Sequence, residues 1–374
     1  MDHAQPRARL RGLYRAGIQG GHRLRVQLAD PLTLSPTAWR PRRLTRTASC
    51  RQHTGSTHQH AAHTDATRRT QQQRIQHMTS KQKVAVIGLG IMGLPMAVNL
   101  VKAGFDVTGY NRSQDKIDKL VSEGGRGAAS VAEAVREADV VITMVPDSPD
   151  VEAVVNGAEG VFANTKDGAL WIDASSIRPD VAVQLASAAR EAGVRPLDAP
   201  VSGGEQGAVD GVLSIMVGGE AADFEAGQEI LNAVGKTIVH VGPSGSGQTV
   251  KAANQLIVAG NIALLAEAIV FLEAYGVDTT AALKVLGGGL AGSKVLEQKG
   301  QKMLDRSFEP GFRLALHNKD MGIVTSAARK AGVSIPVGAL VAQLIGSMVN
   351  QGDGGLDHSG LFKLVEQLSG RTAK

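Results

Sequence analysis

The sequence predicts an α/β domain with a mostly parallel sheet, followed by an all-helical domain, with one long helix joining the two. From Lys83 onward, short β-branched runs alternate with helical stretches, which is the pattern of a parallel sheet wrapped by helices. After the glycine- and serine-rich stretch 242–247 the strand signals stop, and helical patterns continue to the C-terminus. We therefore expect the sheet domain over residues 81–243 and the helical domain over residues 244–374.

The first 77 residues differ in composition from the rest of the chain. They hold fourteen Arg, no Lys, three acidic residues and seven of the ten His, so their formal charge is about +11 and that of the remaining chain about −6. The basic pI of 9.3 therefore reflects this segment alone. A surface that attracts nucleic acid is not expected on the folded part, and we predict no nucleic-acid partner.

Residues 1–77 show neither a helical nor a strand period, so we expect a disordered tail outside the functional part of the protein. A transit peptide fits the abundance of Arg and the scarcity of acids. Sequence upstream of the true start fits better, because Met78 stands directly before the first predicted strand. The single cysteine, Cys50, lies in this tail, so a folded part without disulfides and a cytoplasmic setting are expected.

The expected strands are short apolar runs separated by helical stretches. They cover residues 84–87, 107–110, 140–145, 170–173, 196–198, 213–217 and 237–241.

The long helix is expected over residues 248–275 and is apolar on most faces. Its apolar stretch has the length of a membrane span but contains Asn261, Glu267 and Glu273. A helix buried by both domains is therefore expected, with no membrane partner.

A cofactor site is predicted at the end of the first strand. Residues 84–87 run into the motif G-L-G-I-M-G, and a helix follows. In such a motif the first Gly permits a tight turn, the second lets the backbone approach a pyrophosphate, and the third lets the helix pack on the strand. This context predicts a Rossmann-type domain that binds a dinucleotide. The expected cofactor-binding residues here are Gly88, Leu89, Gly90, Ile91, Met92 and Gly93.

The end of the second strand indicates which dinucleotide is bound. A site selective for NAD usually carries an acid there to bond the ribose 2′-hydroxyl, but this chain has Asn111, Arg112 and Ser113. The Arg112 guanidinium matches the oxygens of a 2′-phosphate, so we predict that NADPH is preferred to NADH. Stacking of Arg112 on adenine is the alternative, and it would accept either cofactor.

A substrate site is predicted from two further stretches. Ser202, Gly203 and Gly204 form a glycine-rich turn after a strand, where successive amides can hold a carboxylate. Lys251 and Asn254 lie three residues apart on one face of the long helix, as a proton donor and an orienting amide would. An isolated helical Lys is ordinarily a solvated charge, but here an otherwise apolar helix surrounds it.

Four separated blocks resemble the β-hydroxyacid dehydrogenase family, and the resemblance covers residues 83–370. The blocks are the fingerprint 88–96, the loop 198–207, the helix with Lys251 and Asn254, and the pair Lys319–Asp320. The resemblance implies NAD(P)-dependent reduction of a small carboxylated aldehyde, with Lys251 as the catalytic residue.

The resemblance also implies further residue roles. Ser202, Gly203 and Gly204 would hold the substrate carboxylate, Asn254 would orient the substrate, and Lys319 would reach the nicotinamide and the substrate from the helical domain. Val145, Pro146 and Ser176 would line the nicotinamide ribose. A homodimer or homotetramer built on the helical domain is implied as well. No spacing of His, Cys or acidic residues indicates a metal site.

Within the family, residues 288–293 and 310–320 are most similar to reductases that convert 2-hydroxy-3-oxopropionate (tartronate semialdehyde) to D-glycerate. Related 3-hydroxyisobutyrate dehydrogenases usually lack the residues at Arg313 and His317, which we therefore expect to contact substrate. A surface salt bridge and an interdomain hydrogen bond are equally compatible roles. Reduction of another semialdehyde is the alternative activity, and a non-catalytic dinucleotide-binding protein is the alternative class.

Overall fold

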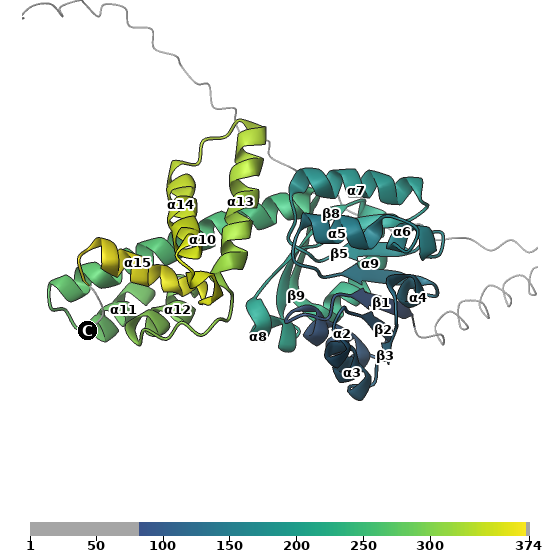
Figure 1. Cartoon of the computed structure of the whole chain (residues 1–374), viewed down its shortest axis with the longest axis horizontal. Helices are drawn as coiled ribbons and strands as arrows, with labels where there is room; N and C mark the ends of the chain where they lie inside the picture. Colours follow the sequence, from purple (N-terminus) through teal and green to yellow (C-terminus); the bar gives the residue numbers. More distant parts are fainter. Residues whose placement is uncertain (1–81, 372–374) are drawn as a thin grey trace, which may run out of the picture. The chain divides into compact units, whose positions relative to one another are not determined.

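The computed structural model describes residues 82–371, and the predicted disordered segment 1–77 lies outside them. The described part begins with a sheet that helices flank (Figure 1). The sheet has nine strands in the order β3-β2-β1-β4-β5-β6-β8-β7, with β9 also paired to β8. The strands are β1 (Lys83–Ile87), β2 (Asp106–Tyr110), β3 (Arg126–Gly127), β4 (Val140–Thr143), β5 (Leu170–Asp173), β6 (Arg195–Asp198), β7 (Val201–Ser202), β8 (Leu213–Gly219) and β9 (Gly235–Gly242).

The strands from β3 to β6 are all parallel, whereas β8 runs antiparallel to both β6 and β7. The chain order along the sheet reverses between β1 and β4, and in doubly wound folds ligands bind outside the carboxyl ends of the strands at such a point. This topology confirms the predicted Rossmann-type domain.

Helices cover both faces of the sheet, because alternate strand residues point to opposite sides. In β1, Val84 and Val86 join one apolar core, and Ala85 and Ile87 join the other. The first core includes residues of α2 (Gly93–Lys102), α3 (Gln114–Ser122), α8 (Gly204–Val209) and α9 (Ala221–Val234). The second includes residues of α4 (Val131–Val135), α5 (Ser148–Val155), α6 (Val161–Asn164) and α7 (Pro179–Glu191).

The rest of the described chain is helical, as predicted, and has a third core of its own. Its elements are α10 (Ser246–Ala274), α11 (Thr279–Gly287), α12 (Lys294–Leu304), α13 (Leu314–Ala331), α14 (Pro336–Asn350), η1 (Asp353–Gly355), η2 (His358–Gly360) and α15 (Leu361–Leu368). The long joining helix α10 contacts β8 and also packs against α12, α13, α14 and α15. By length and composition it is also the one helix in the described residues that could span a membrane, but it forms the centre of this core.

Two short strands, β3 and β7, were not predicted. Each has two residues, which is too few for a period of two to be recognised. β3 is defined by its pairing with β2, and β7 by its pairing with β8, both of which are tertiary facts. The predicted strand 140–145 ends earlier, at Thr143, so that Met144 and Val145 lie in the loop beyond it.

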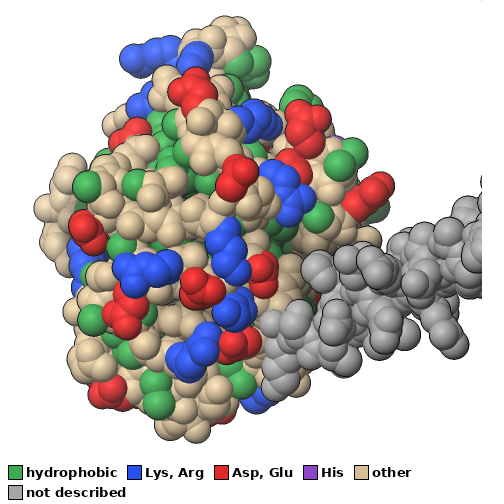
Figure 2. Space-filling model, turned by 90° about the vertical axis from the view of Figure 1, so that its right-hand side faces the viewer, with side chains coloured by type: hydrophobic (Ala, Val, Ile, Leu, Met, Phe, Trp, Pro, Cys, Tyr) green, Lys and Arg blue, Asp and Glu red, His purple; other side chains and the backbone are tan. Residues whose placement is uncertain are grey.

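Charged side chains of both signs are mixed over the molecular face in Figure 2. Acidic and basic groups alternate there at short range rather than gathering into one field of a single sign. This face therefore has no extended basic surface of the kind that follows a phosphate backbone.

Candidate active site

The glycine fingerprint forms the turn between β1 and α2. Gly88 has a φ of +99°, and a Cβ built there would lie 2.3 Å from the Met144 carbonyl oxygen. A Cβ on Gly93 would lie 1.9 Å from the Gly88 carbonyl oxygen, whereas one on Gly90 would meet nothing within 4 Å. The first and third glycines are therefore required by packing, and the second leaves an open approach to the backbone. This arrangement fits a bound pyrophosphate.

The predicted ribose-binding residues follow β2, the neighbour of β1 in the sheet. The Asn111 side-chain oxygen accepts a hydrogen bond from the Leu89 backbone N–H at 3.1 Å, which fixes the glycine turn to the end of β2. Leu89 itself is buried in the core, so only its backbone faces the turn. Arg112 and Ser113 are exposed at the strand end, where a phosphate can reach them.

The ends of β4 and β5 bring the remaining predicted cofactor residues beside the glycine turn. Val145 and Pro146 follow β4, and Ser175 and Ser176 follow β5. The Val145 N–H donates to the Ser175 hydroxyl at 3.0 Å, which joins the two loops. The carboxyl ends of β1, β2, β4 and β5 thus form one continuous edge for a dinucleotide.

The predicted carboxylate-binding turn starts at the end of β7. Gly203 has a φ of +143° and Gly204 a φ of +65°, so both positions favour glycine. Ser202 precedes them, and α8 begins at Gly204. In the structure, the predicted loop has a backbone conformation that residues with a Cβ rarely adopt.

Lys251 joins this turn to the long helix α10. Its ammonium donates to the carbonyl oxygen of Val201, the residue before Ser202, over 2.7 Å. Lys251 is 9% exposed, and burial lowers its pKa from 10.5 to about 8. The Asp320 carboxylate acts in the opposite direction, and the positive charge of Lys319 adds to the lowering. An amine with a pKa of about 8 is thereby placed at the predicted carboxylate-binding turn.

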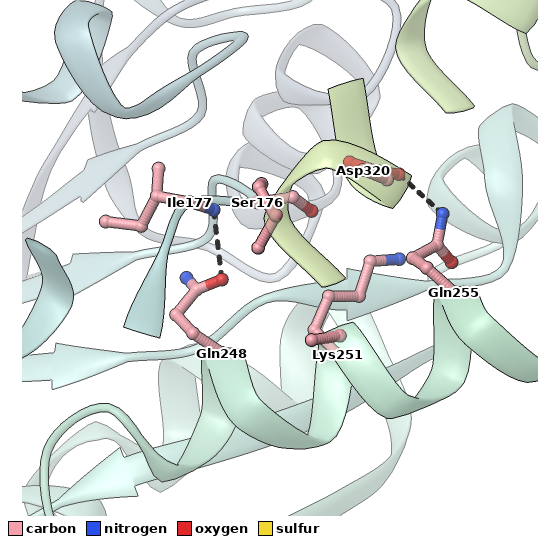
Figure 3. Close-up of a pocket in the computed structure, with 8 residues that line it drawn as sticks. Ser176, Ile177, Gln248, Lys251, Gln255 and Asp320 are labelled. Carbon is pink, nitrogen blue, oxygen red and sulfur yellow. Dashed lines mark hydrogen bonds between the residues drawn. The ribbon is translucent and has the colours of Figure 1, made fainter. Parts of the chain in front are cut away.

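Polar groups that were not predicted surround Lys251 in a small pocket (Figure 3). Asp320 is 3% exposed and accepts a hydrogen bond from the Gln255 side chain at 2.5 Å. Asn254 donates to the Gln255 side-chain oxygen at 2.8 Å, so the predicted orienting amide is part of this network. Within residues 82–371 no hydrogen bond joins Asn254 to Lys251 directly. The pocket is lined by Ser176, Ile177, Gln248, Lys251, Ala252, Gln255, Asp320 and Ile323.

Lys319 reaches from the helical domain to the cofactor side of the site. Its ammonium donates to the Ser176 carbonyl oxygen at 2.7 Å and forms an ion pair with Asp320 at 2.9 Å. Lys319 therefore lies between the loop after β5 and the Lys251 pocket, as a residue near both cofactor and substrate would.

His317, a predicted substrate contact, lies in the interior of the helical domain. His317 has 0% exposure, and its Nδ1 lies 3.2 Å from Nδ1 of His358 inside the helical domain. Phe312 packs edge-on against both rings, and within residues 82–371 the His317 Nε2 has no hydrogen-bond partner, so its contact with substrate stays a prediction. Arg313 is exposed at the start of α13, and its backbone pairs with that of Asp357. The structure does not bring Arg313 to Lys251 by any hydrogen bond within the described residues.

Both parts of the described chain match known family models. Residues 83–242 match the NAD binding domain of 6-phosphogluconate dehydrogenase. Residues 245–365 match the model described as NAD-binding of NADP-dependent 3-hydroxyisobutyrate dehydrogenase. With the glycine turn, these matches identify an NAD(P)-binding oxidoreductase.

Individual proteins are similar over nearly their whole length. The 2-hydroxy-3-oxopropionate reductase of Escherichia coli (strain K12) is 40% identical over 287 residues, which cover 77% of this chain and 98% of the relative. The NAD-dependent L-serine dehydrogenase of Pseudomonas aeruginosa is 36% identical, over 78% of this chain and 100% of the relative. A Mycobacterium tuberculosis 3-hydroxyisobutyrate dehydrogenase solved with L-serine has a TM-score of 0.70 at 31% identity, over 76% of this chain and 99% of that one. The chain belongs to the β-hydroxyacid dehydrogenase family of NAD(P)-dependent oxidoreductases.

Proposed function

We propose that this enzyme reduces 2-hydroxy-3-oxopropionate to D-glycerate, with NADPH as the preferred cofactor. The observation that carries the proposal is the hydrogen bond from the Lys251 ammonium to the carbonyl of Val201, directly before the Ser202–Gly203–Gly204 turn. This contact puts a proton donor beside a candidate carboxylate site. The 40% identity to a 2-hydroxy-3-oxopropionate reductase supports that substrate within the family.

The proposed chemistry divides between the turn and the lysine. The Ser202 hydroxyl and the amides of Gly203 and Gly204 hold the substrate carboxylate, which orients the aldehyde toward Lys251. When bound, the reduced nicotinamide supplies the hydride that forms the new C–H bond at the aldehyde carbon. Lys251 gives a proton from its ammonium to the carbonyl oxygen, which becomes the alcohol. In the reverse direction, neutral Lys251 takes that proton back.

The preference for NADPH rests on the exposed end of β2. No acid follows Tyr110 there, and Asn111 is engaged with the glycine turn through the Leu89 N–H. The exposed Arg112 guanidinium remains to pair with a 2′-phosphate, and the Ser113 hydroxyl lies next to it in the sequence.

A panel of substrates tests the proposal. Oxidation of NADPH and NADH by the full chain is followed with 2-hydroxy-3-oxopropionate, methylmalonate semialdehyde, succinic semialdehyde and glyoxylate at equal concentration. The proposal expects the highest kcat/KM for 2-hydroxy-3-oxopropionate with NADPH. A higher kcat/KM for methylmalonate semialdehyde would favour a 3-hydroxyisobutyrate-type activity. No reduction of any aldehyde by cofactor-bound protein would favour a non-catalytic dinucleotide-binding protein.

A further inference from the structure

We propose that Gln248 is a positioning residue, which sets the place of Lys251 relative to the cofactor-side loop 175–177. The proposal rests on the proposed function, because it assigns a role in the reduction to a residue whose side-chain oxygen and nitrogen are both hydrogen-bonded within the protein. Gln248 lies three residues before Lys251 on α10, so the two side chains share a helix face. Both line the pocket of Figure 3.

The Gln248 side chain makes two hydrogen bonds across the domain boundary. Its amide oxygen accepts from the Ile177 N–H at 3.0 Å, and its amide nitrogen donates to the Ser175 carbonyl oxygen at 2.7 Å. The residue is 1% exposed, so both hydrogen bonds are shielded from water. One side chain thereby fixes the first turn of α10 to the loop that follows β5.

The same turn of α10 is held from a second strand. Asp198 ends β6 and accepts from the Gly245 N–H at 2.7 Å and from the Gln248 N–H at 2.9 Å. Asp198 also lies three residues before Val201, whose carbonyl oxygen accepts a hydrogen bond from the Lys251 ammonium. The start of α10 is thus hydrogen-bonded both to the loop 175–177 and to Asp198, which begins the segment that leads to Val201.

The loop 175–177, which Gln248 bonds, is also hydrogen-bonded to other residues of the candidate site. The hydroxyl of Ser175 accepts from the Val145 N–H, and the carbonyl of Ser176 accepts from the Lys319 ammonium. Three consecutive residues, 175 to 177, are therefore bonded to α10 or α13. Loss of the Gln248 side-chain amide removes two of these hydrogen bonds and leaves the one from Lys319.

These two hydrogen bonds bear on the reaction because the proposed proton donor and the hydride donor are held by different domains. Lys251 is carried by α10, whereas the predicted nicotinamide-ribose contacts Val145, Pro146 and Ser176 are carried by the sheet domain. A displacement of about 1 Å between reacting groups can cost on the order of 10²-fold in rate. In the part of the chain that the structure describes, Gln248 is the side chain that bonds the first turns of α10 directly to the loop 175–177.

Gln248→Met tests the proposal, because methionine has a similar length and forms neither bond. We expect kcat to fall roughly 10- to 100-fold while the dissociation constant of NADPH changes by less than about threefold. We also expect a larger deuterium isotope effect on kcat with NADPH deuterated at both C4 positions, because a misplaced proton donor slows the chemical step. Gln301→Met is the matched control, since Gln301 is exposed and, among residues 82–371, its side chain bonds only to Asp305, the residue that follows α12.

A second readout does not depend on any substrate. The pKa of Lys251 is measured by competitive acetylation and mass spectrometry in the parent and in Gln248→Met. We expect the pKa to rise from about 8 toward 10.5 in the variant, because a loosened contact lets water reach the ammonium. A parent that reduces no aldehyde would refute the proposed function, and this measurement would still decide the role of Gln248.

Gln248→Glu keeps the experiment informative if Gln248→Met folds poorly. A protonated glutamic acid can accept from Ile177 and donate to Ser175, whereas the ionised form can only accept. Its activity relative to the parent should therefore fall as pH rises. An unchanged Lys251 pKa together with kcat within about threefold of the parent in folded Gln248→Met would overturn the positioning role.

Discussion

The Lys251 ammonium and the Val201 carbonyl oxygen are joined by a hydrogen bond of 2.7 Å. Lys251 belongs to α10 and Val201 to β7, so this contact closes the helical domain onto the loop that carries Ser202. Within residues 82–371 this carbonyl is the one hydrogen-bond acceptor of the buried ammonium, so its remaining N–H groups can face a substrate oxygen. This contact places the proposed proton donor beside the predicted carboxylate-binding turn.

The rate of reduction should depend on pH through Lys251. Its pKa is lowered to about 8, and reduction requires the ammonium form. We expect kcat for aldehyde reduction to fall as pH rises through that value, and kcat for alcohol oxidation to rise over the same interval. Steady-state rates from about pH 6 to about pH 10 check both limbs. A reductive rate that stays constant across this interval would argue against Lys251 as the donor.

The same lysine should make stability depend on pH. Lys251 has a pKa of 10.5 when unfolded and about 8 when folded, so the unfolded state binds more protons between these values. The free energy of unfolding of the parent should therefore rise with pH in that interval relative to Lys251→Met, by on the order of 3 kcal/mol. Urea unfolding at several pH values measures it. The same substitution at exposed Lys284 is the control, and an equal pH dependence in both variants would contradict the prediction.

Arg112 should determine the cofactor preference. Removal of the guanidinium in Arg112→Ala should raise KM for NADPH by about tenfold or more and leave KM for NADH nearly unchanged, because only NADPH carries the 2′-phosphate. Initial rates with each cofactor test this, with Arg136→Ala as a control at an exposed Arg after α4. Equal losses with both cofactors would instead indicate stacking on adenine.

Two glycines of the fingerprint should respond differently to an added methyl group. A Cβ on Gly93 would lie 1.9 Å from a backbone oxygen, so Gly93→Ala should lower Tm and abolish NADPH binding. A Cβ on Gly90 would meet nothing within 4 Å, so Gly90→Ala should keep its Tm and lose affinity for the pyrophosphate. Thermal unfolding and fluorescence titration with NADPH distinguish the two. Full affinity in Gly90→Ala would place the pyrophosphate elsewhere.

The longer helices and strands of this fold could be predicted from the sequence. The apolar runs of the longer strands and the 29-residue helix α10 extend over enough residues to show their periods. The G-L-G-I-M-G turn could be placed because strand and helix flank it. Lys251 could be singled out because it interrupts an apolar helix.

The network around Lys251 could not be predicted in this way. Gln248 bonds to residues 71 and 73 positions away, and Gln255 to one 65 positions away, so no local pattern records these partners. The contacts of His317 with Phe312 and His358 could not be predicted either, because both partners lie outside α13. Cross-domain polar contacts arise from packing, and a sequence pattern reports only which residues share an element.

The most direct test of the central claim is transfer of label to the product. The full chain is mixed with 2-hydroxy-3-oxopropionate and NADPH deuterated at both C4 positions, and the product is analysed by NMR and mass spectrometry. The account predicts D-glycerate with one deuterium at C3, formed roughly 10²- to 10⁴-fold more slowly by Lys251→Ala although that variant still binds NADPH. Glycerate formed at parental rate by Lys251→Ala, or no labelled glycerate from the parent, would contradict it.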